Sequence, residues 1–194
     1  MSHYEITSRH KGSLLRLYTP DDDEVRQCAE RLAGFYNDPY NSTMMDHTTD
    51  HTAEDIAKIY SSHAPDTLRF FIAADGVFLG DADLRRINSQ ARTAEYAVMI
   101  GERGTQGKGW GTQVSIMLTY FAFSALQLQT IYLTIIPANV AGRRCYEKVG
   151  YAVDNSAGAA NYREHPTDLV MSVDRAAFLL RHRQLLPPIL IRLA

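Results

Sequence analysis

Apolar and polar positions follow two different periods in the middle of the chain. Residues 94–100 form an apolar run that is typical of a buried strand. From Trp110 onward the apolar positions recur every three to four residues, at 110, 114, 117, 118, 121, 122, 125 and 126, which predicts a helix. Residues 131–136 form a second apolar run, and a short helix after them ends at Gly150, a residue suited to a helix cap. The pattern therefore predicts strand, helix, strand and helix in succession.

Upstream of this stretch the pattern predicts one strand and one helix, followed by an irregular segment. Residues 14–18 are expected to form the first strand. Thr19 is expected to be the N-cap and Pro20 the first position of a helix that runs to about Phe35. Residues 36–50 are polar and are expected to be irregular.

Further elements flank the central stretch on both sides. A helix is expected from Thr52 to about His63, and strands are expected at 68–73 and 77–84, joined at Asp75-Gly76 in a hairpin. Beyond the central stretch, residues 155–161 have the composition of a loop and residues 169–173 are expected to form a final strand. The apolar residues after Pro187-Pro188 are expected to pack either on this domain or on a second subunit.

Composition narrows the class of protein. The chain has 194 residues, of which 45% are hydrophobic and 22% are charged, and we expect one domain over residues 1–175 with a C-terminal extension of it over 176–194. A net charge of −2 argues against a nucleic-acid partner. The two cysteines, Cys28 and Cys145, form no disulfide or metal pattern, and no apolar run reaches membrane-spanning length. We therefore expect a cytoplasmic protein with no membrane partner.

The loop before the long helix contains glycines at 107, 109 and 111. Glycines let backbone N–H groups approach a ligand, and the helix that follows adds unpaired donors and the positive end of its dipole. This combination suits a phosphate or pyrophosphate. The nucleotide-binding Walker loop is excluded because no Lys-Ser or Lys-Thr pair follows the last glycine, and the three-glycine dinucleotide fingerprint does not match either.

Two motifs together resemble one family. Gln106-x-x-Gly109-x-Gly111 is similar to the acyl-CoA pyrophosphate loop of the GNAT superfamily of N-acetyltransferases, and the segment 100–112 is similar to the branch of ribosomal-protein N-terminal acetyltransferases. Downstream, Asn139, Tyr146 and the ending at 148–151 resemble the second cofactor motif of that family. The close resemblance covers residues 94–151.

The resemblance implies an α/β (α+β) fold with three layers. Its mixed, mostly antiparallel sheet of about seven strands is flanked by helices and splits between the fourth and fifth strands. It also implies direct transfer of an acetyl group from acetyl-CoA, as co-substrate, to a primary amine in a ternary complex. The acceptor stays open among a protein N-terminus, a polyamine, an amino sugar and a small amine, and a homodimer is possible. The alternative is a non-catalytic CoA-binding module that acts as a sensor or interaction domain.

By the same resemblance, backbone groups of the strand at 98–100 hold the pantetheine arm and the glycine loop holds the pyrophosphate. The residues expected to bind the co-substrate are Val98, Met99, Ile100, Gln106, Gly107, Lys108, Gly109, Trp110, Gly111, Thr112 and Asn139. Asn139 could equally be the N-cap of the helix that follows it.

Two residues are candidates for acid–base chemistry. Tyr146 is expected to be the general acid, since a phenol with a pKa of about 10 carries its proton at neutral pH. Glu95 is expected to accept the amine proton, because a carboxylate on a central strand is rarely there for packing. The alternatives are a core tyrosine and a salt bridge from Glu95 to an arginine such as Arg85 or Arg92.

The polar segment after Tyr36 has two further interpretations. Asp46, His47, Asp50 and His51 are metal-ligand types, but their spacing matches no closed zinc set, and we predict no metal. The second interpretation is a substrate-binding loop, because loops on a rigid scaffold commonly carry specificity.

Overall fold

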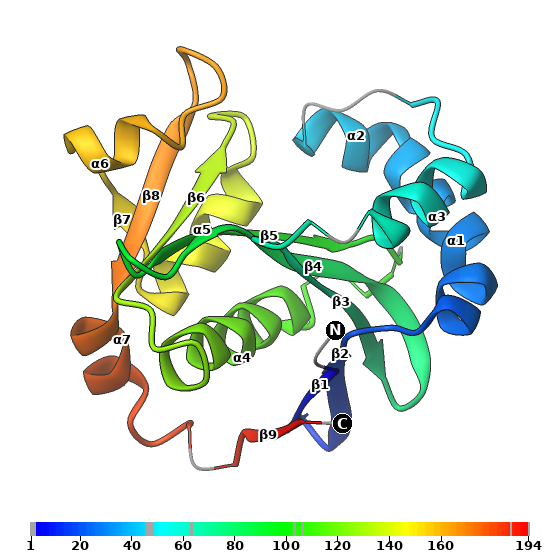
Figure 1. Cartoon of the computed structure of the whole chain (residues 1–194), viewed down its shortest axis with the longest axis horizontal. Helices are drawn as coiled ribbons and strands as arrows, with labels where there is room; N and C mark the ends of the chain where they lie inside the picture. The colour runs from blue at the N-terminus through cyan, green and yellow to red at the C-terminus, as the bar shows by residue number, and fades with distance from the viewer. Residues whose placement is uncertain are drawn as a thin grey trace.

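In the described part of the chain, nine strands form one sheet in the order β7-β8-β6-β5-β4-β3-β2-β1-β9 (Figure 1). The computed structural model describes residues 3–45, 49–62, 64–102, 104–105, 107–186 and 188–193. The strands are β1 Tyr4–His10, β2 Ser13–Tyr18, β3 Leu68–Ala74, β4 Val77–Asn88, β5 Thr93–Ile100, β6 Thr130–Ile135, β7 Ala152–Val153, β8 Leu169–Asp174 and β9 Leu190–Leu193. All neighbouring strands are antiparallel except β5 and β6.

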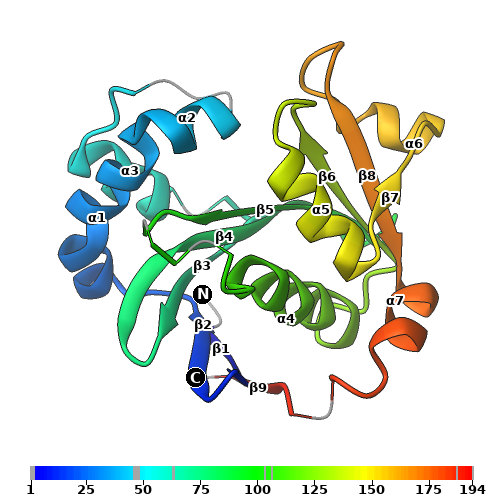
Figure 2. The same cartoon turned by 180° about the vertical axis from the view of Figure 1, so that it is seen from behind.

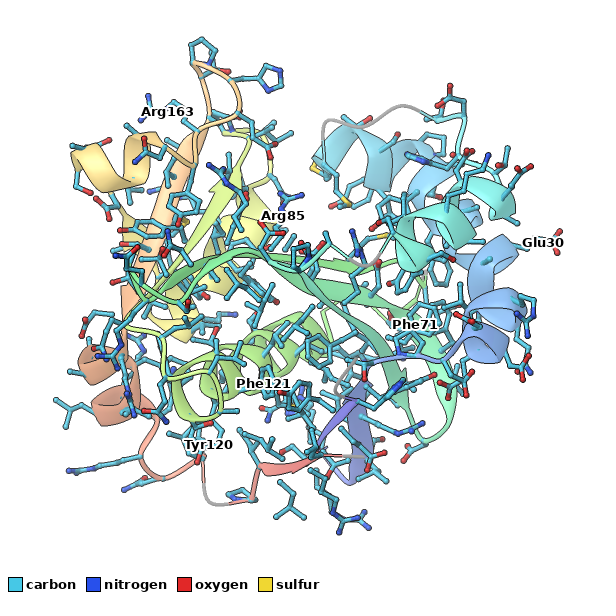
Figure 3. The ribbon with its side chains drawn as sticks, viewed as in Figure 1. Glu30, Phe71, Arg85, Tyr120, Phe121 and Arg163 are labelled. Atoms are coloured by element: carbon cyan, nitrogen blue, oxygen red, sulfur yellow. The ribbon has the colours of Figure 1, made fainter. Side chains whose placement is uncertain are left out.

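Helices cover both faces of this sheet and make three layers, as expected (Figures 1 and 2). The helices are α1 Asp22–Asn37, α2 Pro39–Met45, α3 Ala53–Ser61, α4 Trp110–Ser124, α5 Val140–Val149, α6 Ala157–Ala160 and α7 Arg175–His182. The fully buried Phe121 joins α4 to the core of one face, and the fully buried Phe71 joins β3 to α1 and α3 on the other (Figure 3). Among the described residues, no helix is both long and apolar enough to cross a bilayer.

The sheet splits where β5 meets β6. These two parallel strands pair only from Thr93 to Glu95, and beyond that point they diverge. The split lies between the fourth and fifth strands predicted from the sequence, so that prediction is confirmed. Among the described residues, no strand pairs with the half of β5 from Tyr96 to Ile100 on the side facing β6.

Two strands at one edge were not predicted. β1 was missed because Tyr4 and Ile6 are its only large apolar residues, and its other inward position is Ser8, which is buried and accepts a hydrogen bond from Gln113 Nε2. The apolar residues near the C-terminus pack on this domain: β9 pairs with β1, and Ile189 is buried in the core of the α4 face.

The predicted start of the first helix was wrong by two residues. Asp21, not Thr19, is the N-cap: its carboxylate accepts from the Glu24 N–H at 2.8 Å, and the Glu24 carboxylate accepts from the Asp21 N–H at 3.0 Å. This reciprocal pair satisfies two backbone donors at once. Thr19 instead accepts a hydrogen bond from the Tyr4 N–H, which fastens β1.

Two segments expected to be irregular contain helices. Pro39–Met45 forms α2, which begins after Asp38 ends α1, with the Asp38 carboxylate accepting from the N–H groups of Tyr40 and Asn41. Ala157–Ala160 forms the single turn α6, capped by Ser156. Both helices are too short to show an apolar period, which is why the hydrophobic pattern did not predict them.

Candidate active site

A cavity of about 440 Å³, here called the loop cavity, opens where the glycine loop meets β5 and α5. The residues predicted to bind the co-substrate that line it are Val98, Met99, Ile100, Gly107, Gly109, Trp110, Gly111, Thr112 and Asn139. Lys108 does not line it, and Gln106 lies outside the described residues. The fold therefore gathers most of the set around one space.

The glycines of the loop have backbone conformations that favour glycine. Gly107 has a φ of 75° and Gly109 a φ of 89°, both in the left-handed region. Gly109 is the N-cap of α4, and no side-chain hydrogen bond caps this helix among the described residues. The first N–H groups of a 15-residue helix therefore face the cavity at its positive end, which is an arrangement suited to an anion.

The tip of the β1–β2 hairpin contacts the backbone of this loop. The Lys108 carbonyl oxygen accepts a hydrogen bond from Lys11 Nζ at 3.0 Å and lies 3.2 Å from His10 Nε2. A Cβ added at Gly109 would lie 3.0 Å from the same His10 atom. The hairpin thus contributes to the shape of the loop through the Lys108 backbone.

Two basic residues missed in the sequence lie beside the loop. Arg144 and Lys148 of α5 both line the loop cavity, and both are exposed. They are four positions apart and therefore share a helix face. Two basic residues four positions apart on the helix that follows Asn139 are the signal in the sequence that could have marked them as candidate partners for phosphate groups.

The Asn139 side chain makes hydrogen bonds to both α5 and α2. Its Oδ1 accepts from the Gly142 N–H at 2.8 Å, which confirms the N-cap of α5. Its Nδ2 donates to the Met44 carbonyl oxygen at 3.1 Å and so links α2 to α5. The amide is engaged on both sides, and its contact with pantetheine stays a prediction.

Tyr146 lies where the loop cavity meets a second cavity, the cleft cavity of about 210 Å³. Its ring packs edge-on against Tyr96 and Tyr151, with centroids 6.1 and 6.0 Å away. Its hydroxyl has no hydrogen-bond partner among the described residues, and burial raises the pKa of the phenol well above its usual value. Tyr146 therefore keeps its proton at neutral pH and faces two open spaces.

The cleft cavity is formed by elements far apart in the sequence. Its lining residues are Met44, Met45, Arg85, Tyr96, Ala97, Val98, Thr134, Ile135, Ile136, Asn139, Tyr146, Glu164, His165 and Asp168. Figure 3 shows Arg85 above the middle of the sheet, between the arm formed by β6 and β8 and the helices of the other half. The contribution of α2 agrees with the interpretation of residues 36–50 as a substrate-binding segment.

Glu95 is buried against two arginines. It is 1% exposed, and its Oε1 lies 3.0 Å from Arg85 while its Oε2 lies 3.7 Å from Arg86. It lines neither the loop cavity nor the cleft cavity. This geometry favours the salt-bridge alternative and leaves the base role as a prediction.

A third cavity lies away from the predicted site residues. A cavity of about 690 Å³ lies around the β4–β5 turn and Tyr162, and none of the predicted site residues line it. In the part of the chain that the structure describes, no three His, Cys, Asp or Glu side chains are placed to hold a metal ion. Asp46 and His47, named in the metal hypothesis, lie outside that part.

Comparison with known proteins places this site in a family. Residues 13–152 match the family described as Acetyltransferase (GNAT) domain. The spermidine N(1)-acetyltransferase of Escherichia coli strain K12 is 29% identical over 154 residues, which cover 77% of this chain and 77% of that protein.

Two solved structures share the fold. Mycobacterium smegmatis RimJ in complex with CoA-disulfide superposes with a TM-score of 0.69 at 16% identity, covering 93% of this chain and 95% of that one. Spermidine N-acetyltransferase from Vibrio cholerae in complex with CoA and spermine gives a TM-score of 0.63 at 17% identity, covering 91% and 98%. The chain belongs to the GNAT family and is an acetyl-CoA-dependent N-acetyltransferase.

Proposed function

We propose that the chain acetylates a primary amine of a polyamine, and that the acceptor enters through the cleft cavity. The observation that carries the proposal is the charge around this cavity. Glu164 and Asp168 line it, Glu95 is buried behind it, and Arg85 is its only lysine or arginine among the described residues. Arg85 pairs with Glu95 at 3.0 Å and with Glu164 at 3.3 Å, and Arg86 lies 3.7 Å from Glu95. Three carboxylates therefore stand against two arginines, and this negative balance attracts a polycation.

The loop cavity fits the co-substrate. Phosphate oxygens would accept from the first N–H groups of α4, and Arg144 and Lys148 would add positive charge beside them. The unpaired side of β5 from Val98 to Ile100 would hold the amide groups of the pantetheine arm. When bound, acetyl-CoA supplies an activated acetyl group as a thioester.

Tyr146 is proposed as the general acid of the transfer. It lines both the cavity for the acyl donor and the cavity for the acceptor, so its hydroxyl is near the point where they meet. It would donate its proton to the departing thiolate. Two arginines hold the Glu95 carboxylate. As a base, Glu95 would therefore take the amine proton only through a bridging water.

An acceptor panel tests the proposal. The protein is incubated with acetyl-CoA and with one acceptor at a time, and the release of free thiol is measured. The acceptors are spermidine, spermine, an aminoglycoside, a peptide with a free N-terminus, and butylamine as the single-amine control. We expect the two polyamines to give the highest kcat/KM, and we expect KM to rise with ionic strength, because screening weakens attraction to the carboxylates. Equal rates with butylamine and spermidine would contradict the polyamine assignment.

A protein N-terminal amine is the second candidate acceptor. The similarity of residues 100–112 to the ribosomal-protein branch favours it. A higher kcat/KM with the peptide than with both polyamines would support it. CoA binding without thiol release from any amine would instead favour a non-catalytic binding module. The predicted homodimer and cytoplasmic location stay predictions.

A further inference from the structure

Two aspartates stand side by side on β4, facing the α1 and α3 helices. Asp81 and Asp83 are two positions apart and so point to the same face of the sheet. They lie opposite Met99 and Ala97 of β5 in the sheet register. They are therefore adjacent to the strand that is proposed to hold the acyl donor.

The two carboxylates differ in their partners. Asp81 accepts hydrogen bonds from the hydroxyls of Tyr60 at 2.9 Å and Tyr36 at 3.2 Å. Asp83 Oδ1 is buried and has no hydrogen-bond partner among the described residues. Although Arg69 is its register partner on β3, no ion pair to Asp83 is present in the described part of the chain. A buried acceptor left without a donor is destabilising, so this oxygen needs an explanation.

A small cavity lies against the Asp83 side chain. Its volume is about 20 Å³, which is room for one water molecule or one ammonium group. The lining residues are Tyr36, Met45, Asp81, Ala82, Asp83, Ala97, Val98 and Met99. Met45 and Val98 also line both the loop cavity and the cleft cavity. Asp83 itself lines neither larger cavity, and the small cavity, bounded by Met45 and Val98, is what connects its unpaired oxygen to the place where they meet.

We propose that Asp83 is the proton acceptor for the acceptor amine, a role that rests on the proposed amine acetylation. The carboxylate takes one proton from the primary ammonium, directly or through one water in the small cavity. The freed nitrogen lone pair forms the C–N bond with the thioester carbonyl carbon, and the C–S bond breaks. The departing thiolate takes the Tyr146 proton, and the second proton lost by the nitrogen restores Tyr146. One proton leaves through Asp83, which balances the reaction.

The charges around Asp83 suit this role. Burial raises its pKa to about 6, a value that leaves it ionised at neutral pH but a stronger base than an ordinary aspartate. Arg85 and Arg69 act in the opposite direction, and the Glu95 charge adds to the rise. The neighbouring Asp81 has a pKa of about 7, raised by burial and by the Asp83 charge, against the hydrogen bonds from Tyr60 and Tyr36.

The test compares Asp83→Asn with Asp81→Asn, a matched change two residues away on the same face. Wild-type kcat/KM should fall tenfold per pH unit below about pH 6, as Asp83 takes up a proton. Asp83→Asn should lower kcat/KM at neutral pH by about 10²- to 10⁴-fold, the usual value of a positioned base. Its rate should then rise tenfold per pH unit toward the pKa of the free amine, about 10, since only neutral amine reacts.

Controls separate this role from a structural one. Asp81→Asn should retain the limb near pH 6, Asp83→Glu should restore part of the rate, and calorimetry should give wild-type CoA affinity for Asp83→Asn. An Asp83→Asn enzyme with the wild-type pH profile, or one changed only in KM, overturns the inference. A wild-type protein that acetylates no amine overturns the proposed function and this inference with it.

Discussion

The two ends of the proposed site are built in different ways. At the loop cavity the chain offers backbone N–H groups, from the glycines and from the first turn of α4. At the cleft cavity it offers side chains, from α2, β4, β6 and the segment before β8. A phosphate can be held by backbone dipoles whatever the neighbouring side chains are. An acceptor amine has to be recognised by particular charged groups at particular places.

This difference has a consequence for how each end should respond to mutation. A substitution at the loop cavity should change CoA affinity only if it alters the shape of the backbone or removes one of the exposed positive charges. Changing a side chain at the cleft should matter through chemistry, with little effect on binding of the acyl donor. Tyr146, which borders both cavities, is the residue at which these two responses can be compared directly.

The largest expected effect is the loss of turnover in Tyr146→Phe. The substitution removes the acidic proton and keeps the ring that packs on Tyr96, so kcat should fall by about 10²- to 10⁴-fold while CoA affinity is retained. Tyr151→Phe is the matched control, because that buried hydroxyl bonds only Thr119 at 2.9 Å in the described structure. It should reduce stability by about 1 kcal/mol and keep turnover. If Tyr146→Phe turns over at the wild-type rate, the acid lies elsewhere.

The loop end of the site could be predicted from the sequence because backbone geometry restricts residue choice. Left-handed φ values at Gly107 and Gly109 favour glycine, and the cap of α5 favours Asn139, so these positions stand out in a single sequence. The strand, helix and split-sheet arrangement was confirmed for the same reason, since long elements have clear periods.

The cleft end could not be predicted because it depends on residues that only the fold brings together. Asp83 is a polar residue in an alternating strand, and nothing local shows that its Oδ1 is left unpaired beside Val98. Glu95 shows the same limit: its strand position allowed either a base or a salt bridge, and only the register shows that the neighbouring strand places Arg85 directly opposite. Ion pairing across a sheet overrides what one strand suggests.

The next largest effect is expected at Gly109, where a side chain is disfavoured twice. Gly109→Val places a β-branched residue at a φ of 89° and puts Cβ 3.0 Å from His10 Nε2, so the backbone is strained and either the His10 ring or the loop must shift. We expect the dissociation constant for CoA to rise by at least about 10-fold, measured by calorimetry.

Gly76→Val is the control for backbone strain. Gly76 has a φ of 80° and open space around its added Cβ, and it does not line the loop cavity. This variant should lose stability without losing CoA affinity. Equal loss of affinity in both variants would mean that strain, rather than the shape of the loop, accounts for the Gly109→Val result.

The smallest expected effect is the loss of one exposed charge beside the loop. Arg144→Gln removes a cation from the loop cavity, and because Arg144 is exposed, the loss should be about 0.5–1 kcal/mol, or roughly 2- to 5-fold in CoA affinity. Arg143→Gln is the matched control, since the neighbouring arginine pairs with Glu147 at 2.9 Å and does not line the cavity. The difference between the two variants should shrink as salt is raised from low to physiological concentration, because ions screen an exposed charge but leave backbone donors in place. A difference that is independent of salt would mean that Arg144 acts through packing, and would weaken the division between charge and backbone at this end of the site.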